Sequence, residues 1–162
     1  MKKEHIYDFV FAGAGAATLQ IVQKLIKSGK FSKASILILE QDSNKKNDRT
    51  WCFWEKKEYN NWDEHVENQW DKIYFNSPTF DLKTTIAPFA YKKIRSASYY
   101  DQMRKQIQNS PSIEIRYEKV ISHLESSNLV EINTDSNNYK SSYFFNSVLN
   151  WSKIKGLSLI HI

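Results

Sequence analysis

The first forty residues contain two apolar runs on either side of an amphipathic stretch. The run Ile6–Ala12, IYDFVFA, has the length and composition of a strand buried on both faces. Over Ala16–Ser28 apolar residues recur at helical spacing, and Gly29 fits a helix C-cap. Residues 35–39, SILIL, predict a second buried strand that leads into Glu40. Strand, helix and strand in this order predict a βαβ unit with a right-handed crossover.

The middle of the chain mixes a polar stretch with aromatic and strand-like runs. Residues 41–49 are polar and rich in lysine, which predicts a loop, although they lead directly into the aromatic run at 51–54. A helix is predicted over residues 97–108, ended by the Asn-Ser-Pro sequence at 109–111. Strand-like composition marks residues 70–75 and 80–86, with Pro78 and Pro88 as breaks.

The last third of the chain alternates apolar and polar residues in short stretches separated by turn residues. These stretches are residues 113–117, 120–124, 129–132 and 139–145. Alternation with a period of two is typical of half-buried strands, so we predict a small antiparallel β-meander here. A complete α/β domain carries more strands than this. We therefore expect residues 1–147 to form an incomplete N-terminal domain, and we assign no element to the tail at 148–162.

Composition indicates a packed chain. Of the 162 residues, 41% are hydrophobic and 14% aromatic, so apolar burial can offset the entropy lost on ordering. The net charge of +5 would suit an anionic partner. However, bases and phosphates are read mainly by arginine, which is scarce here, and the lysines are scattered. We interpret the charge as a solvated surface and expect no nucleic-acid partner, with a basic nucleic-acid-binding module kept as an alternative.

Cys52 is the single cysteine, which excludes an internal disulfide and a cysteine-based zinc cluster. We expect it to be a buried small apolar residue in a reducing, cytoplasmic setting. The histidines show no ligand spacing, so no metal site is predicted. No apolar run reaches the roughly 18 residues that would span a bilayer. We interpret five acidic residues in the middle of the chain as a solvated face: Glu55, Glu58, Asp63, Glu64 and Glu67.

A glycine turn follows the first predicted strand. It reads Gly13-Ala14-Gly15-Ala16-Ala17-Thr18 and holds the first two glycines of the G-x-G-x-x-G dinucleotide motif. Gly13 permits a tight turn, and Gly15 lets the backbone approach a pyrophosphate. The helix that begins here supplies N–H groups and the positive end of its dipole. Thr18 replaces the third glycine, which weakens the motif because the β-branched side chain lies where helix and strand pack closely.

Glu40 ends the second predicted strand, where an acid can accept hydrogen bonds from the ribose hydroxyls of an adenosine. A 2′-phosphate would be repelled by the same carboxylate, so these residues indicate FAD or NAD. The alternative is a βαβ corner that binds no nucleotide.

The stretch Asn47–Glu55, NDRTWCFWE, soon after this unit, resembles the N-terminal part of the bacterial lycopene cyclase family. Weaker similarity extends over about residues 5–147. The resemblance implies a Rossmann-like FAD-binding unit of the glutathione-reductase type, an α/β fold, with FAD bound without a covalent link. It also implies an enzyme that closes rings at the ends of lycopene or a related linear carotenoid by acid catalysis through a carbocation. The reaction has no net redox change, yet needs reduced FAD, with NADPH as the usual electron source.

The resemblance also implies which residues bind the cofactor. They are Gly13, Ala14, Gly15 and Thr18 at the pyrophosphate, Glu40 at the ribose, Val120 at the adenine, and Arg49, with Arg95 as a lesser candidate. An exposed ion pair is the alternative for Arg49. Trp51, Phe53 and Trp54 either form an aromatic wall beside the polyene or pack in a core, and we name Trp51 and Trp54 as the candidates near the substrate.

The family's catalytic acid lies beyond these residues, so we nominate no proton donor and expect the 162 residues alone to have little or no activity. We also expect peripheral attachment to a membrane through apolar patches. The competing hypothesis is another FAD-dependent oxidoreductase, such as an aromatic hydroxylase or a prenyl-chain reductase.

Overall fold

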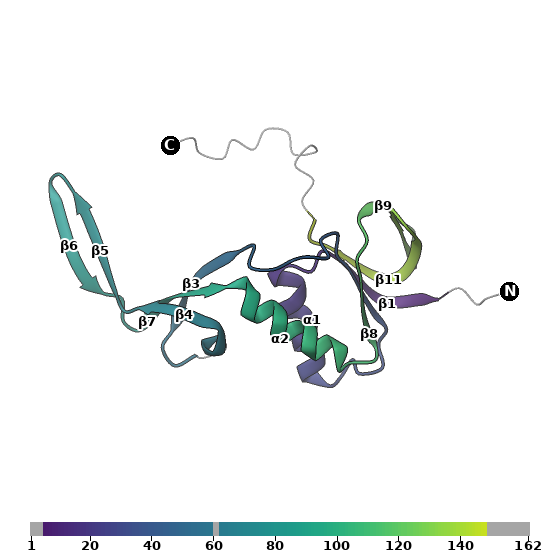
Figure 1. The fold of residues 1–162 in the computed structure, drawn as a ribbon, viewed down its shortest axis with the longest axis horizontal. Helices are drawn as coiled ribbons and strands as arrows, with labels where there is room; N and C mark the ends of the chain where they lie inside the picture. Colours follow the sequence, from purple (N-terminus) through teal and green to yellow (C-terminus); the bar gives the residue numbers. More distant parts are fainter. Residues whose placement is uncertain (1–4, 60–61, 149–162) are drawn as a thin grey trace. The chain divides into compact units, whose positions relative to one another are not determined.

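The computed structural model describes residues 5–59 and 62–148 (Figure 1). The chain forms two compact units within the stretch 1–147 for which the sequence suggests one domain. The first unit combines the residues up to Ser43 with those from Gln106 onward, and the second is Asn44–Lys105. Apart from Val148, the predicted tail at 148–162 lies outside the described residues.

The first unit is built on a six-stranded sheet of order β8-β2-β1-β11-β10-β9. Its elements are β1 (Ile6–Ala12), α1 (Ala16–Ser28), β2 (Ile36–Leu39), β8 (Ile113–Arg116), β9 (Val120–Glu125), β10 (Val130–Thr134) and β11 (Asn138–Asn146). The strands β8, β2, β1 and β11 pair in parallel, whereas β9, β10 and β11 form an antiparallel meander. The predicted βαβ unit is confirmed, including the left-handed C-cap at Gly29, where φ is 66°.

One strand was assigned to the wrong part of this sheet. The stretch at residues 113–117 was predicted to open the antiparallel meander, but β8 pairs in parallel with β2, from Ile36 opposite Ile113 to Leu39 opposite Arg116. Because β8 has a neighbour on one side only, it is half-buried, and its residues alternate like those of an antiparallel edge strand.

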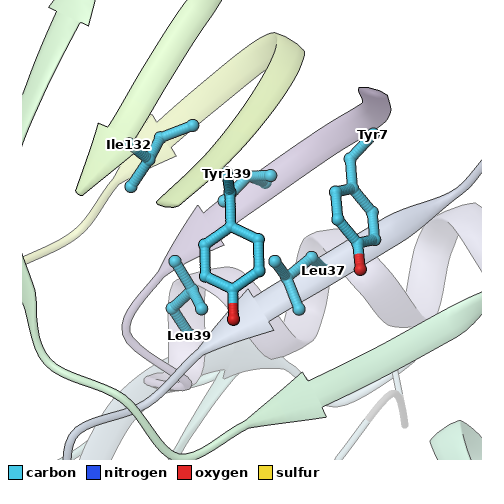
Figure 2. Close-up of a cluster of buried hydrophobic side chains, with 6 residues drawn as sticks. Tyr7, Leu37, Leu39, Ile132 and Tyr139 are labelled. Atoms are coloured by element: carbon cyan, nitrogen blue, oxygen red, sulfur yellow. The ribbon is translucent and has the colours of Figure 1, made fainter. Parts of the chain in front are cut away.

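One hydrophobic cluster in the core of this unit links the parallel strands to the meander. Tyr7, Leu37, Leu39, Ile132 and Tyr139 pack together with Val10, as Figure 2 shows. These side chains are 8% exposed or less. Apolar residues from β1, β2, β10 and β11 therefore fasten the meander to the parallel strands, although those segments are far apart in the sequence.

A polar network closes one edge of this core. The Tyr139 hydroxyl accepts a hydrogen bond from Arg116 at 2.9 Å and donates one to Glu118 at 2.7 Å. Arg116 also binds Glu114 at 2.7 Å, and the Tyr7 hydroxyl donates to Glu114 at 2.9 Å. Burial and the Glu114 carboxylate raise the pKa of Tyr7 to about 12, so the phenol remains a donor at neutral pH.

Glu118 is 9% exposed, and its carboxylate collects several donors. Burial alone would raise its pKa, but hydrogen bonds from Thr134, Tyr139 and Asn137 outweigh burial and lower the pKa below the ordinary value. The bond from Thr134 Oγ1 is 2.6 Å long. Glu118 is therefore held as an ionised group that ties the start of β9 to β10 and β11.

The second unit contains two smaller sheets and a helix. Its elements are β3 (Thr50–Lys56), the 3-10 helix η1 (Asp63–His65), β4 (Val66–Trp70), β5 (Lys72–Ser77), β6 (Phe80–Thr85), β7 (Phe89–Arg95) and α2 (Ser96–Gln108), which runs into the first unit. The order β3-β7-β4 makes an antiparallel sheet, and β5 pairs with β6 in a separate two-stranded sheet.

The sequence predicted the helix α2 but not all of these strands. The strand-like stretch at residues 70–75 is divided between β4 and β5 at Asp71. The strands β3 and β7 were not predicted, because charged residues occupy covered positions: Lys92 in β7 is 2% exposed. Its ammonium binds Glu55 at 2.8 Å and also Asp63, which balances the buried charge.

We expect Glu118→Gln to lower the free energy of unfolding by about 2 kcal/mol at pH 7, since several hydrogen bonds to a buried charge weaken together. The folded pKa of Glu118 is depressed, so its stabilisation is complete above the unfolded value of 4.5 and is lost as the pH falls through the lower folded pKa. Urea denaturation of wild type and variant between pH 7 and pH 3 should show the gap closing. Glu125→Gln, at an exposed position at the end of β9, should show no such gap at any pH.

Candidate nucleotide-binding site

Gly13 occupies a position that accepts no side chain. Its φ is +89°, in the region that disfavours L residues, and its N–H donates to the Leu39 carbonyl at 2.7 Å. A Cβ at Gly13 would lie 2.8 Å from Ser147 Oγ. The chain therefore turns sharply at the carboxyl end of β1 while remaining bound to the neighbouring strand β2.

Gly15 differs from Gly13 because the space around it is open. It is the N-cap of α1 with φ −81°, and a Cβ placed on it would meet no atom of the described residues within 4 Å. Within the part of the chain that the structure describes, no side chain caps α1. The first N–H groups of a helix have no acceptor inside it, so the start of α1, next to Gly15, suits an anion.

Thr18, at the place of the third glycine, is accommodated by Ser147. Its side chain is 2% exposed, and its hydroxyl lies 3.5 Å from Ser147 Oγ. Ser147 Oγ in turn donates to the Ala12 carbonyl at 2.7 Å. The small residue after β11 thus leaves room for threonine where the motif has glycine. Ser147 follows the strand predicted over residues 139–145, and the sequence did not reveal this contact.

Glu40 joins the glycine turn to the loop after β2. Its carboxylate accepts the Ala14 N–H at 2.8 Å through Oε2 and the Asp42 N–H at 3.0 Å through Oε1. The residue is 5% exposed. An acid at this position therefore fixes the conformation of the turn, in addition to any bond that it makes to a ribose.

The other two predicted cofactor residues lie in different units. Val120 begins β9 in the first unit and packs, half-buried, against the core cluster that includes Leu39. Arg49 belongs to the second unit, where its side chain is 70% exposed and lies 3.9 Å from Asp48. The ion pair weighed as the alternative for Arg49 is thus present. Its backbone N–H also binds Ser96 Oγ at 3.2 Å, next to the start of α2.

The aromatic run of β3 is divided between the two faces of its sheet. Trp51 and Phe53 are half-buried, and the Trp51 ring makes edge contacts with Tyr99 and Tyr100 of α2 at 6.1 and 5.8 Å. Trp54 points to the opposite face and is 53% exposed. Trp51 therefore packs against α2, whereas Trp54 is accessible. Because the two tryptophans lie on opposite faces, the run does not form one continuous aromatic wall.

Trp54 belongs to a row of aromatic rings across three strands that the sequence did not reveal. Its ring centroid lies 5.0 Å from that of Tyr91 in β7, which lies 5.9 Å from that of Trp70 in β4. Cys52 shares this face and is exposed, so the prediction of a buried cysteine was wrong. Alternation along β3 places Cys52 and Trp54 on the side away from α2.

Four of the five acidic residues predicted to form a solvated face are exposed: Glu58, Asp63, Glu64 and Glu67. Glu55 is the exception. Glu55 contacts the buried Lys92, and its side chain is 11% exposed. Glu67 binds both Lys93 at 2.8 Å and Arg95 at 3.0 Å. These contacts, with the hydrogen bond to Lys93 the largest, lower the pKa of Glu67. Cross-strand pairing sets these acids beside lysines and arginines, which a linear pattern of charge does not show.

Among the residues that the structure describes, 5–59 and 62–148, no group of three His, Cys, Asp or Glu side chains is placed to hold a metal ion. None of the helices in these residues has the length and apolar character needed to span a bilayer.

We expect Gly13→Ala to destabilise the first unit by about 2 kcal/mol, because alanine at φ +89° is strained and its Cβ would displace Ser147 Oγ. Gly15→Ala is the matched control, since φ is ordinary and the space is open, and it should cost less than about 1 kcal/mol. Chemical denaturation measures both values. Equal losses would show that the turn does not have the described conformation.

Solved structures with the same fold differ strongly from the chain in sequence. The chain resembles p-nitrophenol 4-monooxygenase PnpA from Pseudomonas putida DLL-E4 at 14% identity and a TM-score of 0.63, over 89% of the chain and 41% of that protein. Halogenase PltM in complex with phloroglucinol and FAD is 14% identical with a TM-score of 0.59, over 88% of the chain and 34% of that protein. GidA from Aquifex aeolicus is 13% identical with a TM-score of 0.58, over 87% of the chain and 24% of that protein. The chain thus spans less than half of each of these proteins.

These likenesses confirm the predicted α/β fold with a Rossmann-type βαβ unit and an antiparallel meander. Comparison with curated protein sequences gives no match. A family model described as lycopene cyclase protein matches residues 8–143, which is most of the chain. The match includes the glycine turn, Glu40 and the aromatic run of β3. The chain belongs to the lycopene cyclase family.

Proposed function

We propose that the chain forms the FAD-binding part of an enzyme that cyclises the ends of lycopene. The family supports this proposal, and the observation that carries it is the glycine turn at the carboxyl end of β1. That edge of a parallel sheet is where α/β proteins bind their ligands. An FAD complex of a protein with the same fold adds support for the cofactor.

The residues of the turn fit a dinucleotide. The space beside Gly15 would receive the pyrophosphate, and the N–H groups at the start of α1 would donate to its oxygens. Glu40 would accept hydrogen bonds from ribose hydroxyls while holding the turn through Ala14. Val120 would place backbone groups beside the adenine. Arg49 would reach the phosphates or hold the loop beside the flavin. When bound, reduced FAD would supply an electron-rich ring that stabilises nearby positive charge.

The reaction that we propose is an isomerisation. A proton adds to the terminal double bond of lycopene, the resulting carbocation attacks a neighbouring double bond, and a proton is then lost, so the product has the composition of the substrate. NADPH would serve to reduce the flavin and is not consumed in proportion to product. Trp54, whose face is open, is the better of the two tryptophan candidates for contact with the polyene or the cation.

A redox flavoenzyme is the second candidate, since the fold is shared with a monooxygenase.

The proposed site of action is cytoplasmic and at a membrane surface, because the hydrocarbon substrate dissolves in lipid and not in water.

Gly15→Ala should weaken FAD binding at least tenfold without unfolding the chain, because its methyl group enters the space proposed for the pyrophosphate. Equilibrium dialysis with FAD measures the change. Gln20→Ala, at an exposed position of the same helix, should bind FAD as the wild type does. If the variant Gly15→Ala keeps full affinity, FAD does not bind through this turn. If the wild type has no affinity, the proposed function is wrong.

Incubation of the whole protein with lycopene, FAD and NADPH should yield a cyclic product with the same mass as lycopene. Chromatography with mass spectrometry measures this product, and absorbance at 340 nm follows NADPH. Omission of FAD should abolish turnover. A product that has gained oxygen or hydrogen, with NADPH consumed in equal amount, would favour the redox enzyme instead.

A further inference from the structure

The β5–β6 hairpin gathers its aliphatic and phenylalanine side chains on one face and its charged side chains on the other. Cross-strand partners in an antiparallel pair share a face, and the register pairs Phe75 with Leu82 and Ser77 with Phe80. One face therefore carries Ile73, Phe75, Ser77, Phe80, Leu82 and Thr84. The other face carries Lys72, Tyr74, Asn76, Asp81, Lys83 and Thr85.

The apolar face of the hairpin is open to solvent. Phe75 is 54% exposed, Phe80 55% and Leu82 41%. Figure 1 shows β5 and β6 as a two-stranded ribbon, and within the described residues neither strand pairs with any other. A two-stranded hairpin is marginally stable in water by itself. The exposed face thus indicates that the hairpin contacts an apolar partner.

The polar face is basic and carries hydrogen bonds of its own. Lys72 and Lys83 are its cations, and Asp81 is its one carboxylate. Asp81 accepts a hydrogen bond from the Tyr74 hydroxyl at 2.7 Å, and Asn76 donates to that hydroxyl at 3.3 Å. The bond between Tyr74 and Asp81 joins the two strands on the side away from the apolar face. The hairpin therefore combines a net positive charge with an apolar surface.

The size of the apolar face argues against a second copy of the chain as its partner. Six residues per strand and two strands give a face of roughly 200 Å². A stable protein interface buries about 800 Å² on each partner. A bilayer interface has no such minimum area, and it suits an amphipathic element whose lysines reach the headgroups.

We propose that the β5–β6 hairpin inserts its apolar face into the interface of an anionic phospholipid bilayer. Phe75, Phe80 and Leu82 enter the boundary between headgroups and acyl chains. Lys72 and Lys83 extend to the lipid phosphates. This inference rests on the proposed membrane association of the enzyme and names the element responsible. The hairpin would hold the chain at the surface from which a hydrocarbon substrate is drawn.

Flotation of the chain with vesicles of phosphatidylcholine and phosphatidylglycerol tests the proposal. The triple variant Phe75→Ser, Phe80→Ser, Leu82→Ser should lower the partition coefficient at least tenfold. Leu124→Ser is the control, because it removes an apolar side chain of 68% exposure from β9, outside the hairpin, and it should change the coefficient less than twofold. Circular dichroism verifies that each variant is folded.

A second readout locates the contact. With Cys52→Ser removing the single cysteine, Thr79→Cys in the β5–β6 turn takes an environment-sensitive fluorophore. Its emission should shift to the blue on vesicle binding, whereas the same label at Ser136→Cys in the β10–β11 turn should not shift.

The possible outcomes separate this inference from the proposals on which it builds. If wild type and triple variant float equally and the Thr79 label does not shift, the hairpin is not the contact, and membrane association stands. If the wild type fails to float, the proposed membrane association and the role of the hairpin are both wrong. FAD binding is tested separately by equilibrium dialysis. Loss of self-association in the triple variant by sedimentation, without any flotation of the wild type, would identify a second copy as the partner and overturn the proposal.

Discussion

The chain must reverse direction between β1 and α1 in three residues, and this constraint organises the first unit. The reversal places Gly13 at positive φ against Ser147, so the residue that follows β11 sets the space available to the turn. Glu40 then accepts the Ala14 N–H from the neighbouring strand end. Because β1 lies between β2 and β11, the turn is held from both sides. The open space beside Gly15 is thus bordered by backbone whose conformation packing already fixes, and an anion would meet donors that need little rearrangement.

Buried carboxylates recur in this structure, and each is matched by donors rather than by a single opposite charge. Glu40 is held by backbone N–H groups, and Glu118 by hydroxyl and amide groups. In the second unit the pattern is inverted, since the buried cation Lys92 is surrounded by acids. Removing water from a charge is costly unless such partners are present. These residues therefore fix the relative positions of strands that hydrophobic packing alone would leave free to slide.

The sequence predicted the elements that local patterns determine and missed the contacts that depend on distant segments. The βαβ unit and α2 were recognised because helical periodicity, buried runs and a capping glycine act over short distances. The parallel pairing of β8 was missed because an edge strand alternates in the same way in either type of sheet. For the side chains of Ser147 and Lys92, too, the role depends on partners that are distant in the sequence. A serine after a strand and a lysine inside one acquire their roles from Thr18, Glu55 and Asp63, and nothing in their own sequence neighbourhood indicates these partners.

The aromatic run that suggested the family acquires two separate roles from its strand geometry. Residues of a β-strand point alternately to opposite faces, so neighbours in the run cannot act together. Trp51 packs on α2 and stabilises the second unit, while Trp54 joins Tyr91 and Trp70 on the open face. A single stretch of sequence can therefore identify a family without all of its residues serving one site. Trp54, on the face away from α2, is the tryptophan of the run that is exposed and can contribute to a surface for an apolar partner.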